Sequence, residues 1–279
     1  MSTMAFDFHT ASQGKVLINP HRGDCLVCPE NTMPAFQSAL DKGTSCIEID
    51  IAMTSDDRLV VIHDPSVDRT SNGTGYVEQM SLTELQQLDF GSWFDDAYAG
   101  TTISTFEDVL VWAINNNVGL VVEAKQRRRH EQFANVLAEL LHRHPQGLGQ
   151  IVLLGFDHSL VNRAKALVPD LRIQVVTLAQ YADQLGAVLG SSADSVCVEY
   201  PYTTKAILES YKAAGLSTRL YLPNKDKNLD TTQWFNQYYG YDVHSEIIDW
   251  ISSGLIDMLS HDDIAMLKRL VNEAGLEAI

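Results

Sequence analysis

Nine short apolar runs alternate with helical patterns along the chain, and this alternation limits the fold more than any other feature. The runs lie at residues 15–19, 46–51, 59–63, 120–125, 151–156, 172–176, 195–200, 218–222 and 256–260. Helical stretches fill most of the gaps, and some begin after Thr or Ser and end at Gly. Such alternation predicts a parallel sheet, and eight strand–helix units close a barrel. At 279 residues and 45% hydrophobic composition, residues 1–279 suit one α/β domain.

The second and third runs are an exception to this alternation. Only "AMTSDDR" separates them, which leaves no room for a crossover helix, so they predict an antiparallel hairpin. With Asp56 and Asp57 as a two-residue turn, Asp50 would lie opposite His63. The remaining eight strands predict a (β/α)8 TIM-type barrel, with this hairpin arm projecting from its mouth.

Residues 64–105 follow the hairpin and contain turn signals but no strand pattern. An insertion of this length inside a βα repeat is usually functional. The sequence therefore predicts a small cap at the barrel mouth, placed after strand two, and Trp93 is one of the aromatic residues it would hold there.

Charge and hydropathy limit the partners of the chain. Thirty-six acidic and twenty basic residues give a net charge of -16, which disfavours binding to nucleic acid and to anionic lipid surfaces. No signal peptide and no apolar window near the roughly 18 residues of a membrane helix is visible, so we expect a cytoplasmic protein without membrane insertion. Cys25 and Cys28 have no second Cys or His pair at zinc spacing, and we expect no metal or redox role for them.

Charged side chains and histidines gather where the predicted strands end, which is where α/β barrels place their reactive groups. These residues are His21, Arg22, Glu48, Asp50, His63, Glu123 and Lys125. Residues two apart on a strand share a face, so Glu48 lies with Asp50 and Glu123 with Lys125. All seven are expected to converge on one site.

The chemistry of these residues indicates the ligand. Three carboxylates without cysteine favour Mg²⁺ or Ca²⁺. Three negative charges, a divalent cation, Arg22 and Lys125 leave a net charge of about +1, which a phosphodiester would neutralise. His21 and His63 would act as general acid and general base, and the sequence leaves open which is which.

The same residues form motifs that resemble those of the glycerophosphodiester phosphodiesterase family. The family's HRG, five residues and PENT occur at 21–23 and 29–32, E-x-D at 48–50, V-V-x-H-D at 60–64, R-T-x-x-G-x-G at 69–75 and E-x-K at 123–125. The resemblance implies a barrel with an insertion, and metal-dependent hydrolysis of glycerophosphodiesters to glycerol 3-phosphate and an alcohol. Small-molecule substrates such as glycerophosphocholine and glycerophosphoethanolamine would then be expected.

The resemblance also suggests supporting residues, and it weakens after residue 125. Glu30 and Asn31 would fix the loop and orient the imidazole, and Tyr221 with Trp93 would form part of the substrate wall. Gly155 stands where the family has Ser, and Tyr221 and Asn224 stand in its W-T-x-N motif with the middle residues changed. We therefore expect the catalytic residues, up to residue 125, to follow the family pattern. The later strand ends, which would shape the substrate site, are expected to differ from it.

Two other functions stay open at this point. The same groups in a related barrel could form a cyclic phosphate through attack by a substrate hydroxyl, or the chain could bind phosphodiesters without turnover. The leaving alcohol, the choice between Mg²⁺ and Ca²⁺, and the oligomeric state are also open.

Overall fold

The computed structural model describes residues 5–223, 225–226 and 229–279. Its ten-stranded sheet has the order β10-β1-β9-β8-β7-β6-β5-β4-β2-β3. The strands are β1 (Lys15–Pro20), β2 (Cys46–Met53), β3 (Leu59–Val61), β4 (Gly119–Ala124), β5 (Ile151–Gly155), β6 (Ile173–Thr177), β7 (Ser195–Glu199), β8 (Ser217–Tyr221), β9 (Met258–His261) and β10 (Glu277–Ala278). All nine predicted strands are present within two residues at either end, and β10 is an addition that pairs with β1.

Eight of these strands form the barrel. From β2 through β4 to β9 and on to β1, each described neighbour pair is parallel. The ring is completed between β1 and β2 by a single bridge that joins His21 and Glu48. The predicted TIM-type barrel is confirmed, and its seam lies beside the strand ends that carry the first catalytic candidates.

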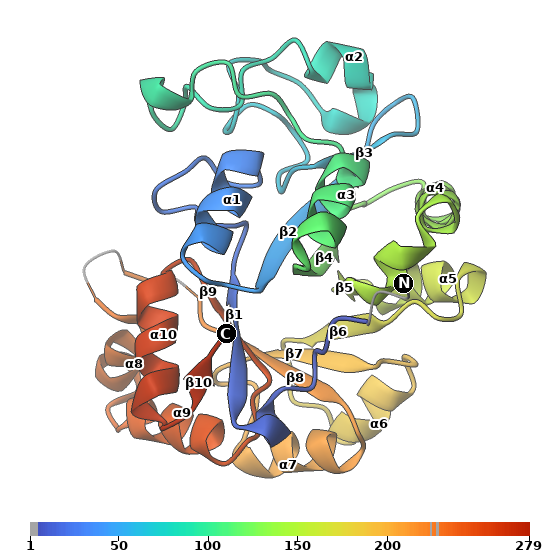
Figure 1. The fold of residues 1–279 in the computed structure, drawn as a ribbon. Coiled ribbons are helices and arrows are strands. Elements are labelled where there is room, and N and C mark those ends of the chain that lie inside the picture. The colour runs from blue at the N-terminus through green and yellow to red at the C-terminus, as the bar shows by residue number, and fades with distance from the viewer. Residues whose placement is uncertain (1–4, 224, 227–228) are drawn as a thin grey trace.

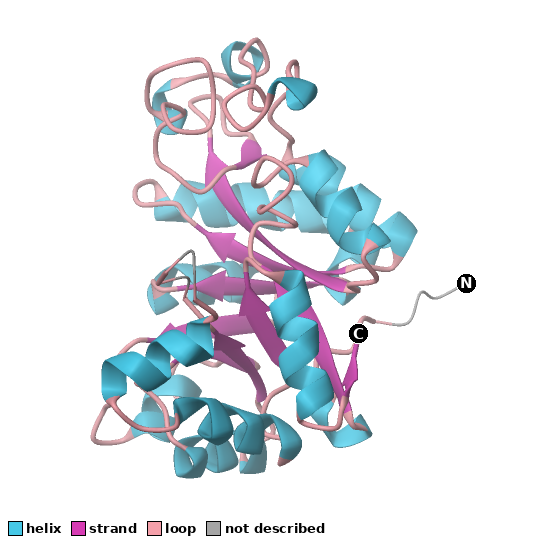
Figure 2. Cartoon of the chain, turned by 90° about the vertical axis from the view of Figure 1, so that its left-hand side faces the viewer, coloured by secondary structure: helices cyan, strands magenta, loops and turns pink. Residues whose placement is uncertain are grey.

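Helices surround the strands on the outside (Figures 1 and 2). They are α1 (Met33–Asp41), α2 (Leu82–Leu85), α3 (Phe106–Asn116), α4 (His130–Arg143), α5 (His158–Leu167), α6 (Gln184–Leu189), α7 (Lys205–Ala213), α8 (Thr231–Tyr239), α9 (Val243–Ser252) and α10 (Ile264–Glu273). Several of these helices have a side chain that caps their N-terminus. The hydroxyl of Thr105, for example, accepts a hydrogen bond from the backbone amide of Asp108. None of the described helices is long and apolar enough to cross a membrane.

The two faces of the barrel strands have different surroundings. On β2, Ile47, Ile49 and Ile51 belong to the large core between strands and helices. Cys46 belongs instead to a small cluster inside the barrel. Because alternate residues share a face, Glu48 and Asp50 continue the inward row that Cys46 begins. The apolar cluster therefore fills the barrel below the charged residues at its mouth.

The predicted hairpin is present, but its predicted register is wrong by one residue. Ile51 pairs with Val61, and the Ile62 amide donates to the Asp50 carbonyl, so Asp50 lies opposite Ile62 and not His63. The loop has three residues, 55–57, and Asp57 has a φ of 59°. A left-handed third residue is characteristic of three-residue hairpin loops, and the extra residue moves the pairing by one.

Residues 64–105 form a mostly irregular segment at the top of Figures 1 and 2. It contains α2 and the 3-10 turns Val77–Gln79 and Asp96–Tyr98. Its buried side chains, including Phe90 and Ile103, pack on Ala52, Val60 and Ile62 of the hairpin arm. The segment thus has a small apolar cluster of its own, which attaches it beside the barrel mouth.

Candidate functional site

Three carboxylates meet at the barrel mouth. Asp50 and Glu123 are direct neighbours across β2 and β4, and one oxygen each of Glu48, Asp50 and Glu123 lie within 4.8 Å of one another. Their residues are 0%, 0% and 6% exposed. Burial, and then the charges of Asp50 and Glu48, raise the pKa of Glu123 to about 7.

This carboxylate group fits a hard divalent cation. Among the described contacts, Glu48 Oε1 and Asp50 Oδ1 are buried and accept no hydrogen bond, and of the two only Asp50 Oδ1 has an ion pair, with Lys125. Buried charged oxygens without hydrogen bonds are costly unless a cation compensates them. Carboxylate oxygens are the ligands that Mg²⁺ and Ca²⁺ prefer. Glu48, Asp50 and Glu123 could therefore hold either ion, as the sequence predicts.

Arg22 and Lys125 place positive charge beside the carboxylates. Arg22 Nε lies 3.3 Å from Asp50 Oδ2, and Lys125 Nζ lies 3.3 Å from Asp50 Oδ1 and pairs with Glu123. Burial alone would raise the pKa of Asp50, but Lys125 and Arg22 outweigh it and lower that pKa. The two cations pair with different oxygens of Asp50 and are placed to bind an anionic group that reaches the carboxylates.

His21 is held from a distant part of the chain. Its Nδ1 lies 2.9 Å from Oδ1 of Asp262, which directly follows β9. Burial favours neutral His21, but Glu48 and Asp262 outweigh it and raise the pKa of the imidazole. The ring of Tyr221 lies 5.2 Å from that of His21. His21 is thus partly buried and oriented, and its pKa lies above the ordinary value.

The surroundings of His63 lower the pKa of its imidazole, in contrast to those of His21. It follows the hairpin arm, and its Nδ1 lies 2.7 Å from Oδ1 of the adjacent Asp64. Burial, with Arg22 and Lys125 nearby, lowers the pKa of His63 despite the attraction of Asp50 and Asp64. At neutral pH, His63 is therefore the imidazole better suited to accept a proton.

The loop after β1 depends on unusual backbone angles. Arg22 and Asn31 both have left-handed φ values, 62° and 57°, and the Asn31 amide donates to the Arg22 carbonyl. Gly23 has a φ of 79°, and a Cβ there would lie 2.9 Å from that of Ala35. The glycine of the HRG motif is therefore needed for both its conformation and its lack of a side chain.

Glu30 and Asn31 fix this loop, but not in the predicted way. The Asn31 side chain donates to Asp50 Oδ2 at 2.8 Å and accepts from the Asp50 amide at 3.2 Å. Glu30 accepts hydrogen bonds from Arg22 and from Arg69 of the inserted segment. Neither residue has a described hydrogen bond to the imidazole of His21. That contact comes from Asp262, which the motifs alone did not connect to His21.

A cavity of about 160 Å³ opens among these groups. It is lined by His21, Arg22, His63, Glu123, Lys125, Leu154, Phe156, Val176, Cys197, Glu199, Arg219 and Tyr221. Tyr221 lines this cavity, and Trp93 is not among its lining residues, so the substrate wall expected from both residues stays a prediction. Asn224 lies outside the described residues. Phe156, Glu199 and Arg219 were not predicted, although Phe156 and Glu199 follow or end strands, as the other site residues do.

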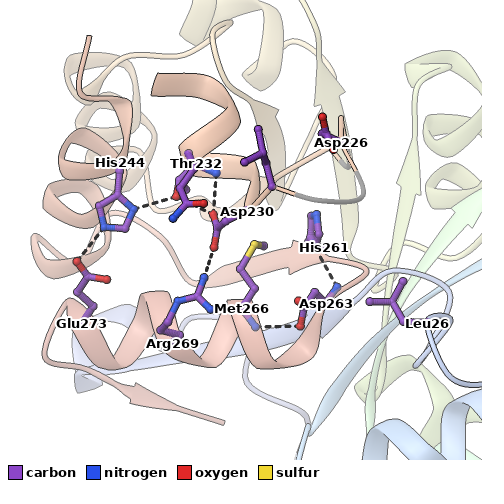
Figure 3. A pocket seen from close by; sticks show the side chains of 12 residues that line it. Leu26, Asp226, Asp230, Thr232, His244, His261, Asp263, Met266, Arg269 and Glu273 are labelled. Atoms are coloured by element: carbon purple, nitrogen blue, oxygen red, sulfur yellow. Dashed lines mark hydrogen bonds and ion pairs between the residues drawn. The ribbon is translucent and has the colours of Figure 1, made fainter. Parts of the chain in front are cut away.

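A larger cavity lies elsewhere, between the loop before α8 and the helix α10 (Figure 3). It has a volume of about 740 Å³, and two pairs of charged side chains line it. Arg269 pairs with Asp230, and His244 Nε2 lies 2.8 Å from Glu273 Oε1. The smaller cavity at the strand ends is the better candidate for catalysis, because His21, His63 and Glu123 line it.

Comparison with known proteins identifies the family of the chain. Residues 21–265 match the Glycerophosphoryl diester phosphodiesterase family. A glycerophosphodiester phosphodiesterase of Caldanaerobacter subterraneus is 33% identical over 207 residues, 72% of this chain and 83% of that protein. YhdW of Bacillus subtilis is also 33% identical, over 74% of this chain and 86% of its own length.

A solved structure shares the fold. It is an Oleispira antarctica phosphodiesterase in complex with sn-glycerol-3-phosphate, with a TM-score of 0.76 and 23% identity, and the match covers 94% of this chain and 99% of that one. The family match spans most of the chain and includes every motif from which the resemblance was inferred. The predicted resemblance and the expectation of an enzyme are confirmed, and the chain belongs to the glycerophosphoryl diester phosphodiesterase family.

Proposed function

We propose that the chain hydrolyses glycerophosphodiesters, such as glycerophosphocholine and glycerophosphoethanolamine, to glycerol 3-phosphate and an alcohol in a reaction that depends on Mg²⁺ or Ca²⁺. The observation that carries this proposal is the buried group of Glu48, Asp50 and Glu123, with Arg22 and Lys125 beside it. A monoanionic phosphodiester is the ligand that this balance of charges favours. The curated name of the Caldanaerobacter relative, a glycerophosphodiester phosphodiesterase, supports the same substrate class.

The cation and the two basic residues would stabilise the substrate and the developing charge. When bound by the three carboxylates, Mg²⁺ or Ca²⁺ supplies positive charge to the phosphoryl oxygens. Arg22 and Lys125 would bind the same phosphate and orient it at the mouth. Because these groups are fixed before the reaction, they need little reorganisation as charge develops.

The two histidines would move the protons. His63, whose pKa is lowered, accepts a proton from water as the water oxygen forms a bond to phosphorus. His21, whose pKa is raised, donates a proton to the alcohol oxygen as its bond to phosphorus breaks. The net reaction adds one water molecule across the P–O bond. Asp64 and Asp262 would act as positioning residues, since each holds Nδ1 of one imidazole.

The inserted segment would serve as the cap of a single catalytic domain. Arg69 joins it to the site, because its guanidinium donates to both Glu30 and Asp64. Glu30 in turn holds Arg22, and Asp64 holds His63. Through these contacts, the position of the cap is linked to a phosphate-binding residue and to the proposed base.

Phosphorus NMR of the purified protein with glycerophosphocholine tests the proposal. We expect a phosphomonoester signal with added Mg²⁺ or Ca²⁺ and its loss with excess chelator. A cyclic phosphate signal would indicate attack by a glycerol hydroxyl and assign the enzyme to the lyases. An intact diester, with this and other headgroups, would refute turnover and favour a binding protein.

A further inference from the structure

The cavity at the mouth has two chemically different halves. The half formed by β1, β2, β3 and β4 carries the histidines, the carboxylates and the phosphate-binding cations. The other half, which we call the β5–β8 wall, is formed by Leu154, Phe156, Val176, Cys197, Glu199, Arg219 and Tyr221. Its members are mainly apolar or aromatic, and Glu199 is its only carboxylate.

Glu199 is a carboxylate without a bonded partner in the part of the chain that the structure describes. It ends β7 directly beside Tyr221 of β8, so both side chains are on the inner face of the wall. No described hydrogen bond or ion pair involves its side chain, although the charges of Lys225 and Arg219 act on it from a distance. A ligand that brings a positive charge to this half-buried carboxylate would stabilise its negative charge.

Arg219 does not provide that partner. Its guanidinium is 3% exposed and donates hydrogen bonds to Asn19 Oδ1 at 2.8 Å, Ser260 Oγ at 2.8 Å and Cys197 Sγ at 3.4 Å. These three bonds hold it below the mouth, inside the barrel. The Glu199 carboxylate therefore stays available to a molecule in the cavity. Burial raises its pKa despite the charges of Lys225 and Arg219, so a ligand that brings a positive charge would favour its ionised form.

Aromatic rings complete a setting for an organic cation. Tyr221 lies next to His21, and Arg219 Cζ is 5.9 Å from the centre of its ring. Phe156 directly follows β5 and is 54% exposed, with Lys125 Nζ 5.9 Å from the centre of its ring. Ring faces and a carboxylate together attract ammonium groups, including quaternary ones that cannot donate hydrogen bonds. Lys125 lies between the phosphate-binding half and Phe156, so an ammonium a few bonds from phosphorus would reach the part of the wall farther from Lys125, at Glu199 and Tyr221.

We propose that Glu199, with Tyr221 and Phe156, selects diesters whose alcohol carries a positive charge, that is, esters of amino alcohols. This inference rests on the proposed function, because it names the alcohol that the same site accepts. The group beside His21 would be the amino alcohol, and the glycerol would extend toward the other side of the phosphate.

The test compares E199Q with the wild-type protein on four diesters. Glycerophosphocholine and glycerophosphoethanolamine carry a cation, whereas glycerophosphoglycerol and glycerophosphoinositol do not. We expect E199Q to lower kcat/KM for the two cationic substrates by about tenfold or more and to leave the other two nearly unchanged. E199A should give the same selectivity change, and E139Q, an exposed change on α4, should change nothing. Circular dichroism would show that each variant is folded.

Three other outcomes would have distinct meanings. An equal loss on all four substrates would overturn the proposal, since Glu199 would then contact the shared glycerol or support the fold. Unchanged selectivity in both Glu199 variants would overturn it as well. If the wild-type protein turns over none of the diesters, the proposed function fails, and calorimetric binding of glycerophosphocholine and glycerophosphoglycerol to wild type and E199Q then decides the selectivity separately.

Discussion

Replacing Asp262 by Asn should shift the pH range in which the enzyme works. The Asp262 carboxylate lies 2.9 Å from His21 Nδ1, and the two side chains are 22% and 15% exposed. Asn keeps an oxygen that can accept the hydrogen bond but removes the negative charge. The difference between a charge-assisted and a neutral hydrogen bond is about 1.4 kcal/mol, or about one pKa unit. Glu48 still raises the pKa of His21 in the variant, so we expect a shift of this size and no larger.

The sign of the effect follows from the proposed role of His21. A proton donor works below its pKa, so the raised pKa of His21 places the loss of activity on the alkaline side, above its ordinary value of 6.5. In D262N that alkaline limb should move about one unit toward lower pH. The acid limb, set by His63 below 6.5, should stay in place.

The assay is release of glycerol 3-phosphate from glycerophosphocholine, with kcat/KM measured across the pH range at constant ionic strength and saturating cation. D170N, which changes an exposed aspartate on another part of the surface, provides the matched control. An alkaline limb that is identical in D262N and wild type would refute the link between Asp262 and the pKa of His21. A movement of the acid limb alone would reverse the proposed roles of the two histidines.

Three further changes test other parts of the site. H63A should abolish turnover but spare most substrate binding by calorimetry; unchanged activity would contradict its role as base. E123Q should weaken Mg²⁺ and Ca²⁺ binding by about tenfold or more, because it removes one of three ligand charges, and an unchanged affinity in titration calorimetry would exclude Glu123 from the metal site. N31A should lower the free energy of unfolding by about 2–4 kcal/mol, since it loses both bonds to Asp50 and places Ala at a left-handed φ. N31G should recover about 1 kcal/mol of that loss in urea denaturation, and equal values for the two variants would contradict the backbone contribution.

Local patterns in the sequence were sufficient to predict the strands and to predict that the charged residues and histidines meet at one site. Eight of the nine apolar runs became strands of the barrel because their β-branched and apolar side chains match a buried parallel sheet, and the ninth pairs antiparallel with β2. His21, Glu48 and Glu123 meet because parallel strands bring their carboxyl ends to one edge, whatever the details of their loops. The topology of the barrel therefore follows from the order of its parts.

Contacts between residues far apart in the sequence could be identified only from the tertiary structure. Asp262 is 241 positions from His21, and no local pattern indicates which acidic residue of the last strand end would reach the imidazole. The hairpin register depended on one left-handed residue, Asp57, which turn propensity did not identify. In the sequence, nothing distinguishes Glu199 from other glutamates at strand ends. The pairing of β7 with β8 places it beside Tyr221. Short-range propensities are set by neighbouring residues, whereas these contacts depend on how the closed barrel brings distant strand ends together.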